Sequence, residues 1–400
     1  MRIAFVYDAL YPYIRGGVEK RVWQLARRLA ARGHEVQLFG MKYWEGPRTI
    51  RREGVTLHGV CRPKALYTRS GRRSITQALA FAAALPFHLG RGRFDLIDCQ
   101  ASAPLACFSS WMVARSKDVP LVLTWQEVWG DYWLEYLGAA GRLGRLFERW
   151  CATLTHHHVA GSEDTAARLE AVLGTSPEWL IPSGIDAAAM NRVPPSRQGC
   201  DIIFFGRLVR EKNVALLLEA LAVLRRRGLF PRVLIFGDGP ERRRLEQRIN
   251  RLGLDRVRLS AWVDGDEDVV SLMKSAKVLA FPSRREGFGL VVLEAMGSGL
   301  PVVTVDHPNN AARHLVGEAG YVTDPEPEAF AGALRALLSD EGRRRTMSAA
   351  AIRQARGRDW EAIVTGVEGL YEAVVEGRPA GQVVVPGPFL AEAASLMGEG

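Results

Sequence analysis

Short apolar runs alternate with segments of helical spacing along most of the chain. Residues 3–7 form an apolar, β-prone run, and residues 18–32 follow it with apolar side chains on one helical face before Gly33. Further strands are predicted at 35–39, 94–98, 121–124 and 158–161. This alternation favours a parallel sheet that is covered by helices.

The same pattern starts again near residue 200. Strands at 201–205 and 232–236 precede helices at 214–227 and 241–252, and later strands are predicted at 257–259, 278–281, 302–305 and 320–322. We therefore predict an α/β protein with two Rossmann-like, doubly wound domains that face each other across a cleft. The predicted parts are an N-terminal domain at 1–186, a linker at 187–199, a C-terminal domain at 200–358, a last helix at 359–378, and a mobile tail at 379–400.

Composition narrows the class of protein further. The chain has 400 residues, too many for one compact core, and 48% apolar and 24% charged residues exclude a largely disordered protein. No apolar stretch is long enough to span a membrane, and the N-terminus does not resemble a signal peptide. The five cysteines are scattered without a CxxC pair, which indicates neither disulfides nor a structural zinc site. We expect a cytoplasmic protein.

Positive charge is concentrated in the first third of the chain. Residues 1–117 hold 20 Lys and Arg against 7 Asp and Glu, a net charge of +13, whereas the whole chain carries +9. Such a field attracts anionic membranes, nucleic acid or phosphorylated substrates. A solvated, arginine-rich surface explains the excess equally well. Within a predicted helix at 141–150, Arg142, Arg145 and Arg149 recur at helical spacing, as in a membrane-surface helix.

Two predicted strand-to-helix loops carry groups suited to an anion. Gly16 and Gly17 stand before the first helix and allow backbone N–H groups to approach a phosphate, although a simple turn explains them equally well. In the second half, Arg207 and Lys212 follow a strand and precede a helix. A planar guanidinium and an ammonium suit a diphosphate, and the alternative is a solvated loop.

The most specific motif joins two carboxylates across a glycine-rich loop. Glu286 and Glu294 stand eight residues apart, with Gly287-Phe288-Gly289 between them and a helix predicted from Leu290. Free N–H groups at the start of that helix favour phosphate, and a carboxylate accepts hydrogen bonds from sugar hydroxyls. A capping acid beside an unrelated solvated glutamate does not easily explain the whole string.

With this motif the chain resembles the retaining glycosyltransferases of family 4, also called glycosyl transferases group 1, which have the two-domain GT-B fold. The Glu-x7-Glu element, the Gly16-Gly17-Val18-Glu19 string, the segment at 181–186, Gly206-Arg207 with Lys212, and the string at 298–303 all match in the expected order. The resemblance covers residues 1–375. It implies a hexosyltransferase that uses a UDP- or GDP-sugar without a metal or other cofactor. It also implies that the last helix, at 359–378, returns to the N-terminal domain.

The resemblance also implies roles for individual residues. Arg207 and Lys212 would hold the diphosphate, and Glu294 the ribose hydroxyls. Donor sugar and phosphate would contact Glu286 and the backbone of Phe288, Gly289 and Leu290, with Gly16 and Gly17 covering the phosphate from the N-terminal domain. The positive charge of residues 1–117 and the arginines of the helix at 141–150 motivate a further expectation. The acceptor would be a saccharide, a lipid-linked saccharide or a polysaccharide precursor, and the protein would attach peripherally to the inner face of the cell membrane through residues 1–117.

One position departs from the family pattern. Gln126 stands where many members have a histidine that contacts the donor sugar near the reacting centre. Glutamine can bind a hydroxyl but cannot carry a proton at neutral pH. Activity is still expected, because the departing phosphate can accept the acceptor's proton. The alternative is a non-catalytic sugar-nucleotide-binding protein or partner subunit.

Three other interpretations carry less weight. Sugar-nucleotide epimerisation on the same fold is open, although the Glu286 and Glu294 spacing favours transfer. Nucleic-acid binding rests on the basic patch alone, without a recognised module, and is not expected. The run His156-His157-His158 is interpreted as structural, because adjacent side chains on a strand point to opposite faces and seldom share a metal.

Overall fold

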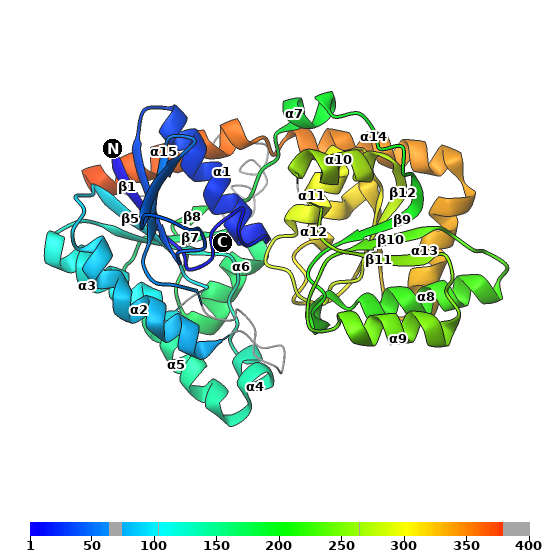
Figure 1. Cartoon of the computed structure of the whole chain (residues 1–400), viewed down its shortest axis with the longest axis horizontal. Helices are drawn as coiled ribbons and strands as arrows, with labels where there is room; N and C mark the ends of the chain where they lie inside the picture. Colours follow the sequence, from blue (N-terminus) through cyan, green and yellow to red (C-terminus); the bar gives the residue numbers. More distant parts are fainter. Residues whose placement is uncertain (64–73, 103, 264, 379–400) are drawn as a thin grey trace, which may run out of the picture. The chain divides into compact units, whose positions relative to one another are not determined.

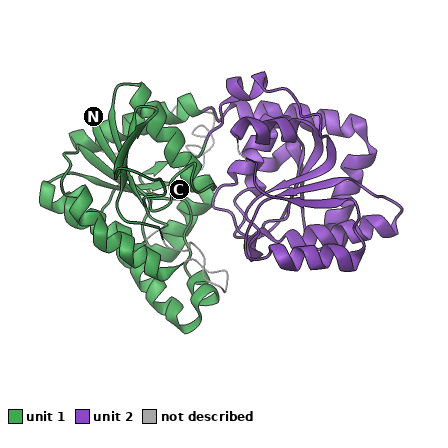
Figure 2. Cartoon of the chain, viewed as in Figure 1, with its two compact units in different colours: residues 1–183, 360–400 green, residues 184–359 purple. Residues whose placement is uncertain are grey.

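The computed structural model of the chain describes residues 1–63, 74–102, 104–263 and 265–378. It divides into two compact units, shown in Figure 2. Unit 1 comprises residues 1–183 together with the C-terminal segment from Trp360, and unit 2 comprises Gly184–Asp359. Each unit is an α/β structure built on its own sheet, so the prediction of two parallel-sheet α/β domains is confirmed.

Unit 1 contains an eight-stranded sheet in the order β3-β4-β2-β1-β5-β6-β7-β8. All neighbouring strands are parallel except β3 and β4, which form an antiparallel pair at one edge. The strands are β1 Arg2–Val6, β2 Glu35–Gly40, β3 Thr49–Arg52, β4 Val55–Gly59, β5 Leu96–Gln100, β6 Leu121–Trp125, β7 His158–Ala160 and β8 Trp179–Leu180.

Helices cover both faces of this sheet (Figure 1). The helices are α1 Gly17–Ala31, α2 Ile75–Leu89, α3 Pro104–Lys117, α4 Tyr132–Leu137, α5 Gly141–Cys151, α6 Glu163–Arg168 and α15 Trp360–Glu376. The buried apolar side chains of α1 and α15 share one core with the sheet, and those of α2, α3 and α5 share another. The C-terminal helix α15 is therefore an integral layer of unit 1, although it follows unit 2 in the chain.

Unit 2 contains a six-stranded, fully parallel sheet in the order β11-β10-β9-β12-β13-β14. Its strands are β9 Cys200–Phe205, β10 Val233–Phe236, β11 Val257–Ser260, β12 Ala276–Phe281, β13 Val302–Val305 and β14 Gly320–Thr323. Its helices are α7 Ala187–Arg192, α8 Val214–Arg226, α9 Arg242–Leu252, α10 Asp266–Lys274, α11 Leu290–Gly297, α12 Arg313–Val316, α13 Pro327–Ser339 and α14 Glu341–Arg356. The central strands are buried on both faces, which explains their continuous apolar runs.

Several elements differ from the sequence predictions. The segment predicted as a linker, 187–199, begins with the short helix α7, whose first turn is capped by the Asp186 carboxylate accepting from the Ala189 amide at 2.8 Å. The β3–β4 pair and helices α2 and α3 had no predicted counterpart. The predicted tail, 379–400, lies outside the described residues. None of the helices described has both the length and the apolar character needed to cross a bilayer.

Candidate active site

The predicted donor residues of unit 2 lie at the point where its strand order reverses. Strand β9 pairs with β10 on one side and with β12 on the other, so the chain leaves β9 and β12 in different directions. A crevice at the carboxyl ends of such strands is the usual ligand site of an open parallel sheet. Arg207 and Lys212 follow β9, and Glu286 follows β12, which places all three at this switch point.

Lys212 and Glu286 form an ion pair at this switch point. Both side chains are largely buried. Ser283 donates a second hydrogen bond to the Glu286 carboxylate at 3.1 Å, and the Lys212 ammonium lies 5.2 Å from the centroid of the Phe281 ring. Arg207, by contrast, is exposed. The arrangement pairs a positive with a negative group, and Arg207 offers a second, exposed cation from the segment between β9 and α8.

The loop that carries Glu286 is held by the backbone of the loop after β13. The Glu286 amide donates to the Asn309 carbonyl at 2.8 Å, and the Ala311 amide donates to the Glu286 carbonyl at 3.0 Å. Asn310 is fully buried and donates to the Val305 carbonyl at 2.8 Å. Backbone pairing on both sides of Glu286 therefore fixes the direction in which its carboxylate emerges.

Gly289 starts helix α11 in a backbone conformation that only glycine adopts readily. Its φ is +95°, and a Cβ there would meet the Ala312 Cβ at 2.4 Å. The helix that follows buries Leu290 and Glu294, whereas Phe288 is only partly buried. The predicted contacts of Phe288, Gly289, Leu290 and Glu294 with a donor stay predictions, but their local structure is a glycine turn into a helix N-terminus.

A second glycine turn supports the loop of Arg207. Gly237 follows β10 with φ +157°, and a Cβ there would meet the Gly206 carbonyl oxygen at 1.9 Å. The Leu208 amide also donates to the Asp238 carbonyl at 2.8 Å. The loops after β9 and β10 therefore pack against each other through backbone, which orders the segment that presents Arg207.

Unit 1 has an equivalent switch point at β1, which pairs with both β2 and β5. Gly16 and Gly17 follow this strand, with Gly16 preceding helix α1 in an extended conformation. A Cβ at Gly16 would meet the Glu19 carboxylate oxygen at 2.3 Å. Gly16 therefore leaves room for the buried side chain of Glu19.

Gln126 follows β6 in unit 1 and belongs to a buried polar chain that the sequence did not predict. Its amide nitrogen donates to the Gln100 side chain at 3.3 Å, and Gln100 donates to the Asp98 carboxylate at 3.0 Å. Asp98 also accepts hydrogen bonds from Thr124 and, at 2.5 Å, from Tyr371 of α15. The signal in the sequence was the polar pair Asp98 and Gln100 inside a buried strand.

Burial has the largest effect on the pKa values of the ionisable side chains in and around this hydrogen-bonded series. Removal from water raises the pKa of Asp98 to about 6, although the hydrogen bonds from Tyr371 and Thr124 act in the opposite direction. Arg21 of α1 is fully buried nearby, and desolvation lowers its pKa to about 10 while the Asp98 carboxylate opposes that shift. Arg21 also donates to the Pro182 carbonyl at 2.6 Å. It therefore stays charged near neutral pH and ties α1 to the end of unit 1.

The strand geometry assumed for the histidine run holds for only one of its three members. His156 and His157 lie in a turn before β7, so the alternation of a strand does not apply to them. Their ring centroids are 3.9 Å apart. His158 is the first residue of the strand and is buried, and its Nδ1 accepts a hydrogen bond from the Trp125 indole at 3.0 Å.

Comparison with known proteins gives two family matches that together span most of the chain. Residues 15–189 match the family described as Glycosyltransferase Family 4, and residues 192–354 match Glycosyl transferases group 1. A D-inositol 3-phosphate glycosyltransferase of Corynebacterium urealyticum is 37% identical over 196 residues, which cover 44% of this chain and 46% of that protein. The protein of the same name from Kineococcus radiotolerans is 28% identical over 91% of this chain and 92% of its own length.

Solved structures show the same fold at lower identity. Sucrose-phosphate synthase from Thermosynechococcus elongatus superposes with a TM-score of 0.79 at 21% identity, covering 94% of this chain and 99% of that one. Anabaena HepE, solved in complex with UDP-glucose, has a TM-score of 0.72 at 20% identity over 93% of this chain and all of its own. Both are GT-B glycosyltransferase folds, which agrees with the two-sheet architecture.

Proposed function

Because the chain belongs to the glycosyl transferases group 1, we propose that it transfers a sugar from a nucleotide-diphosphate sugar to an acceptor hydroxyl. The observation that carries this proposal is the grouping of Arg207, Lys212 and Glu286 at the switch point of the unit 2 sheet. The Glu294 carboxylate belongs to the helix that starts immediately after this loop. This combination of cations, carboxylates and free N–H groups suits a sugar nucleotide rather than a simple phosphate.

Each group has a defined part in the proposed reaction. Lys212 and Arg207 neutralise the diphosphate, which gains negative charge as the bond to the sugar breaks. Glu286, held by Lys212 and Ser283, accepts hydrogen bonds from hydroxyls of the donor sugar. Glu294 accepts from the ribose. Fixed cations and N–H dipoles at this position would make a metal ion unnecessary for departure of the diphosphate.

The stereochemical course that we propose is retention. The bond between the anomeric carbon and the diphosphate oxygen breaks, the acceptor oxygen bonds to the same face of that carbon, and the acceptor proton passes to the departing phosphate. No side chain needs to carry the proton in this scheme. Gln126 is compatible with such a role, because its amide can orient a hydroxyl while its own position is fixed by Gln100.

The donor nucleotide is tested first, by calorimetric titration with UDP and GDP. These two are chosen because HepE was solved with UDP-glucose and a Mycobacterium tuberculosis relative, 33% identical over 36% of this chain, is named as GDP-mannose-dependent. We expect one nucleotide to bind and Arg207→Ala and Glu294→Ala each to weaken it. Arg210→Ala is the matched control, because Arg210 lies in the same loop but is strongly exposed, in a loose pair with Glu241. If Arg210→Ala lost as much nucleotide affinity as the other two variants, the proposed donor site would be contradicted.

A non-catalytic nucleotide-sugar binder is the alternative, and Gln126 is the residue that motivates it. The two functions differ in a turnover experiment with the UDP- or GDP-sugar that binds. A transferase releases nucleotide in proportion to a glycosylated acceptor, whereas a binder takes up the donor and releases nothing above the hydrolysis blank. The Gln126→Ala variant separates them further, because only a transferase loses turnover while retaining nucleotide affinity.

For the acceptor we propose a lipid-linked saccharide at an anionic membrane surface. Seven of the exposed large apolar side chains lie on α2, α3 and α5 of unit 1, namely Ile75, Leu79, Phe87, Met112, Leu143, Leu146 and Trp150. Exposed Arg142 and Arg149 stand on α5 beside three of them. Apolar side chains flanked by cations on one helix are typical of interfacial membrane contact.

Vesicle flotation tests the membrane part independently of the donor. We expect the protein to float with vesicles that contain phosphatidylglycerol and to remain at the bottom with pure phosphatidylcholine. The Trp150→Glu and Leu143→Glu variants should lose this binding, whereas Phe230→Glu, an exposed apolar position of unit 2, should not. Absence of salt-sensitive flotation would remove the membrane proposal and leave the donor site unaffected.

A further inference from the structure

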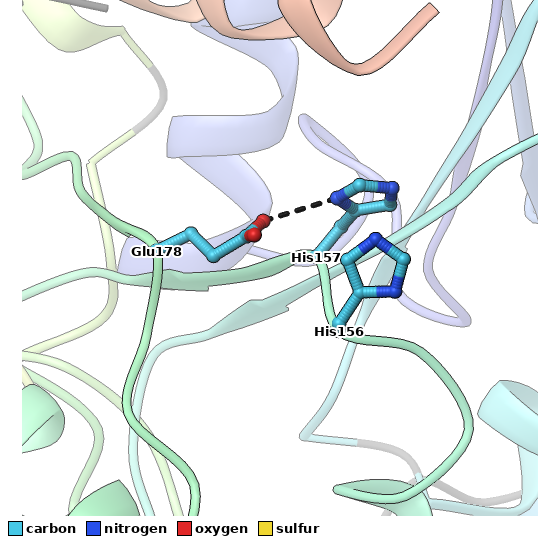
Figure 3. Close-up of side chains that lie close together, drawn as sticks. All are labelled: His156, His157 and Glu178. Atoms are coloured by element: carbon cyan, nitrogen blue, oxygen red, sulfur yellow. Dashed lines mark hydrogen bonds and ion pairs between the residues drawn. The ribbon is translucent and has the colours of Figure 1, made fainter. Parts of the chain in front are cut away.

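A cluster of three metal-ligating side chains lies in unit 1, apart from the groups assigned to the donor (Figure 3). His156 and His157 lie in the turn before β7, and Glu178 immediately precedes β8. Because β7 and β8 are parallel neighbours, with Val159 opposite Trp179, these residues meet at the amino edge of the sheet. The three ligand atoms all lie within 4.8 Å of one another.

We propose that His156, His157 and Glu178 bind a zinc ion. Two imidazole nitrogens and one carboxylate oxygen form a donor set that zinc accepts in proteins, with a water molecule completing the tetrahedron. Bonds of about 2.0–2.2 Å to a tetrahedral zinc put neighbouring ligand atoms roughly 3.4 Å apart. The His157 Nδ1 and the Glu178 Oε2 are 3.0 Å apart, close to that separation.

Only one ligand has to move for the set to close on an ion. His156 is exposed, so its imidazole can turn about its side-chain bonds without disturbing the core. Its ring already lies beside that of His157, with centroids 3.9 Å apart and ring planes tilted by 51°. Figure 3 shows the two imidazoles next to each other, with the Glu178 carboxylate directed toward His157.

Backbone and side-chain bonds hold the other two ligands in place. The His157 carbonyl accepts from the Leu123 amide of β6 at 2.9 Å. Thr155 donates to the Leu121 carbonyl at 2.8 Å and accepts from the His157 amide at 3.1 Å, so the turn is tied to β6. Glu178 is positioned by β8, which starts at the next residue. Such preorganisation lowers the entropy lost when an ion binds.

The position of the cluster separates it from the proposed chemistry. Gln126 and Gly16 follow the carboxyl ends of β6 and β1, at the opposite edge of the same parallel sheet. A zinc ion at the amino edge would instead join the turn before β7 to the segment before β8. Its effect is therefore stabilisation of unit 1, which rises with zinc concentration because the unfolded chain lacks the site.

The test is a zinc titration of tag-free, full-length protein that has been stripped with EDTA and dialysed. We expect calorimetry to find one zinc ion per chain, and Co²⁺ to give the visible absorption of a four- or five-coordinate site. His156→Ala and Glu178→Gln should each weaken zinc binding about 100-fold or more, beyond the range seen for outer-sphere changes. His88→Ala is the control, because that partly exposed histidine lies 3.2 Å from Arg48 rather than beside a carboxylate.

Thermal unfolding supplies a readout that does not depend on affinity alone. Zinc should raise the unfolding temperature of the wild type and of His88→Ala, but not that of His156→Ala, which removes only an exposed side chain. The proposal is overturned if the wild type takes up no zinc in a saturable manner, or if His156→Ala binds zinc as tightly as the wild type does.

Discussion

The Tyr371 hydroxyl of helix α15 donates a hydrogen bond of 2.5 Å to the Asp98 carboxylate of β5, a residue 273 positions earlier in the chain. Both side chains are buried in unit 1. The bond fastens the last described helix to a central strand of the first sheet. Through Gln100 it also connects that helix with Gln126, the residue expected near the reacting centre.

Replacing Tyr371 by phenylalanine should destabilise unit 1 by about 1–3 kcal/mol, the range for a buried acceptor that loses its donor. Urea unfolding followed by tryptophan fluorescence measures this directly, since nine of the ten tryptophans lie in unit 1. Tyr13→Phe is the matched control, because Tyr13 belongs to the same unit but its side chain is exposed. An equal, small effect of both changes would contradict the importance of the buried bond.

The raised pKa of Asp98 predicts a specific dependence of stability on pH. Its folded value of about 6 exceeds the ordinary 3.8, mainly because burial disfavours the charged form, so between these values the folded state binds more protons than the unfolded state. The contribution of Asp98 is therefore fully present below pH about 4 and is lost as the pH rises through about 6. It amounts to about 2–3 kcal/mol.

The comparison of wild type with Asp98→Asn isolates that contribution. As the pH rises from about 4 to about 7, the unfolding free energy of the wild type should fall relative to that of Asp98→Asn. Arg21 adds only a constant offset, because its pKa of about 10 keeps it charged throughout. Parallel stability curves for the two proteins across this range would show that Asp98 does not titrate as expected.

Glu286→Gln should separate diphosphate binding from sugar transfer. The substitution frees Lys212 from its carboxylate partner and removes a negative charge from the place where the diphosphate is expected. We expect the preferred nucleoside diphosphate to bind about as tightly as before, or several-fold tighter, while turnover of the donor falls by about 100-fold or more, the loss typical of an interaction made in the transition state. Lys212→Ala should weaken binding of the nucleoside diphosphate without changing the affinity for the free nucleoside. Weaker nucleotide binding in Glu286→Gln would contradict the proposed division of roles.

Gly289→Ala should impair both stability and donor binding. A methyl group there would meet Ala312 at a left-handed backbone position, and we expect a cost of about 1–3 kcal/mol together with loss of nucleotide affinity. Gly332→Ala in helix α13 is the matched control, since nothing lies within 4 Å of a Cβ at that site, and it should be neutral or stabilising by about 0.5–1 kcal/mol. Nucleotide titration and urea unfolding of the two variants measure both effects.

Local patterns were sufficient for most of the fold. The apolar runs and glycine stops located the central strands, because parallel strands buried on both faces are continuously apolar. They also located several helices, among them α1, α8, α9 and α15. Helix α2 escaped prediction because apolar side chains surround it on nearly all sides, including exposed Leu79 and Phe87, so it shows no clear polar face. The β3–β4 pair escaped prediction because β3 is mostly exposed and polar.

The candidate site was predictable residue by residue but not as a set of contacts. Sequence placed Lys212 and Glu286 in separate loops, and their pairing depends on the order of β9 and β12 in the sheet. The partner of Tyr371 was equally hidden, because the apolar face of the last helix does not say which polar group it covers. The strand geometry assumed for His156 was wrong for a local reason, since this residue lies in the turn before β7.

Because helix α15 belongs to unit 1, the unit whose translation starts first is the last to have all its residues synthesised. Residues 1–183 leave the ribosome first, but their core also contains Trp360, Ile363, Val364, Val367, Leu370, Tyr371 and Val374. Until those residues emerge, one face of the first sheet lacks its covering layer, whereas unit 2 is one uninterrupted stretch of chain. The half that is translated first is therefore the half that finishes folding last, and a nascent chain arrested before residue 360 exposes an apolar surface to which chaperones can bind.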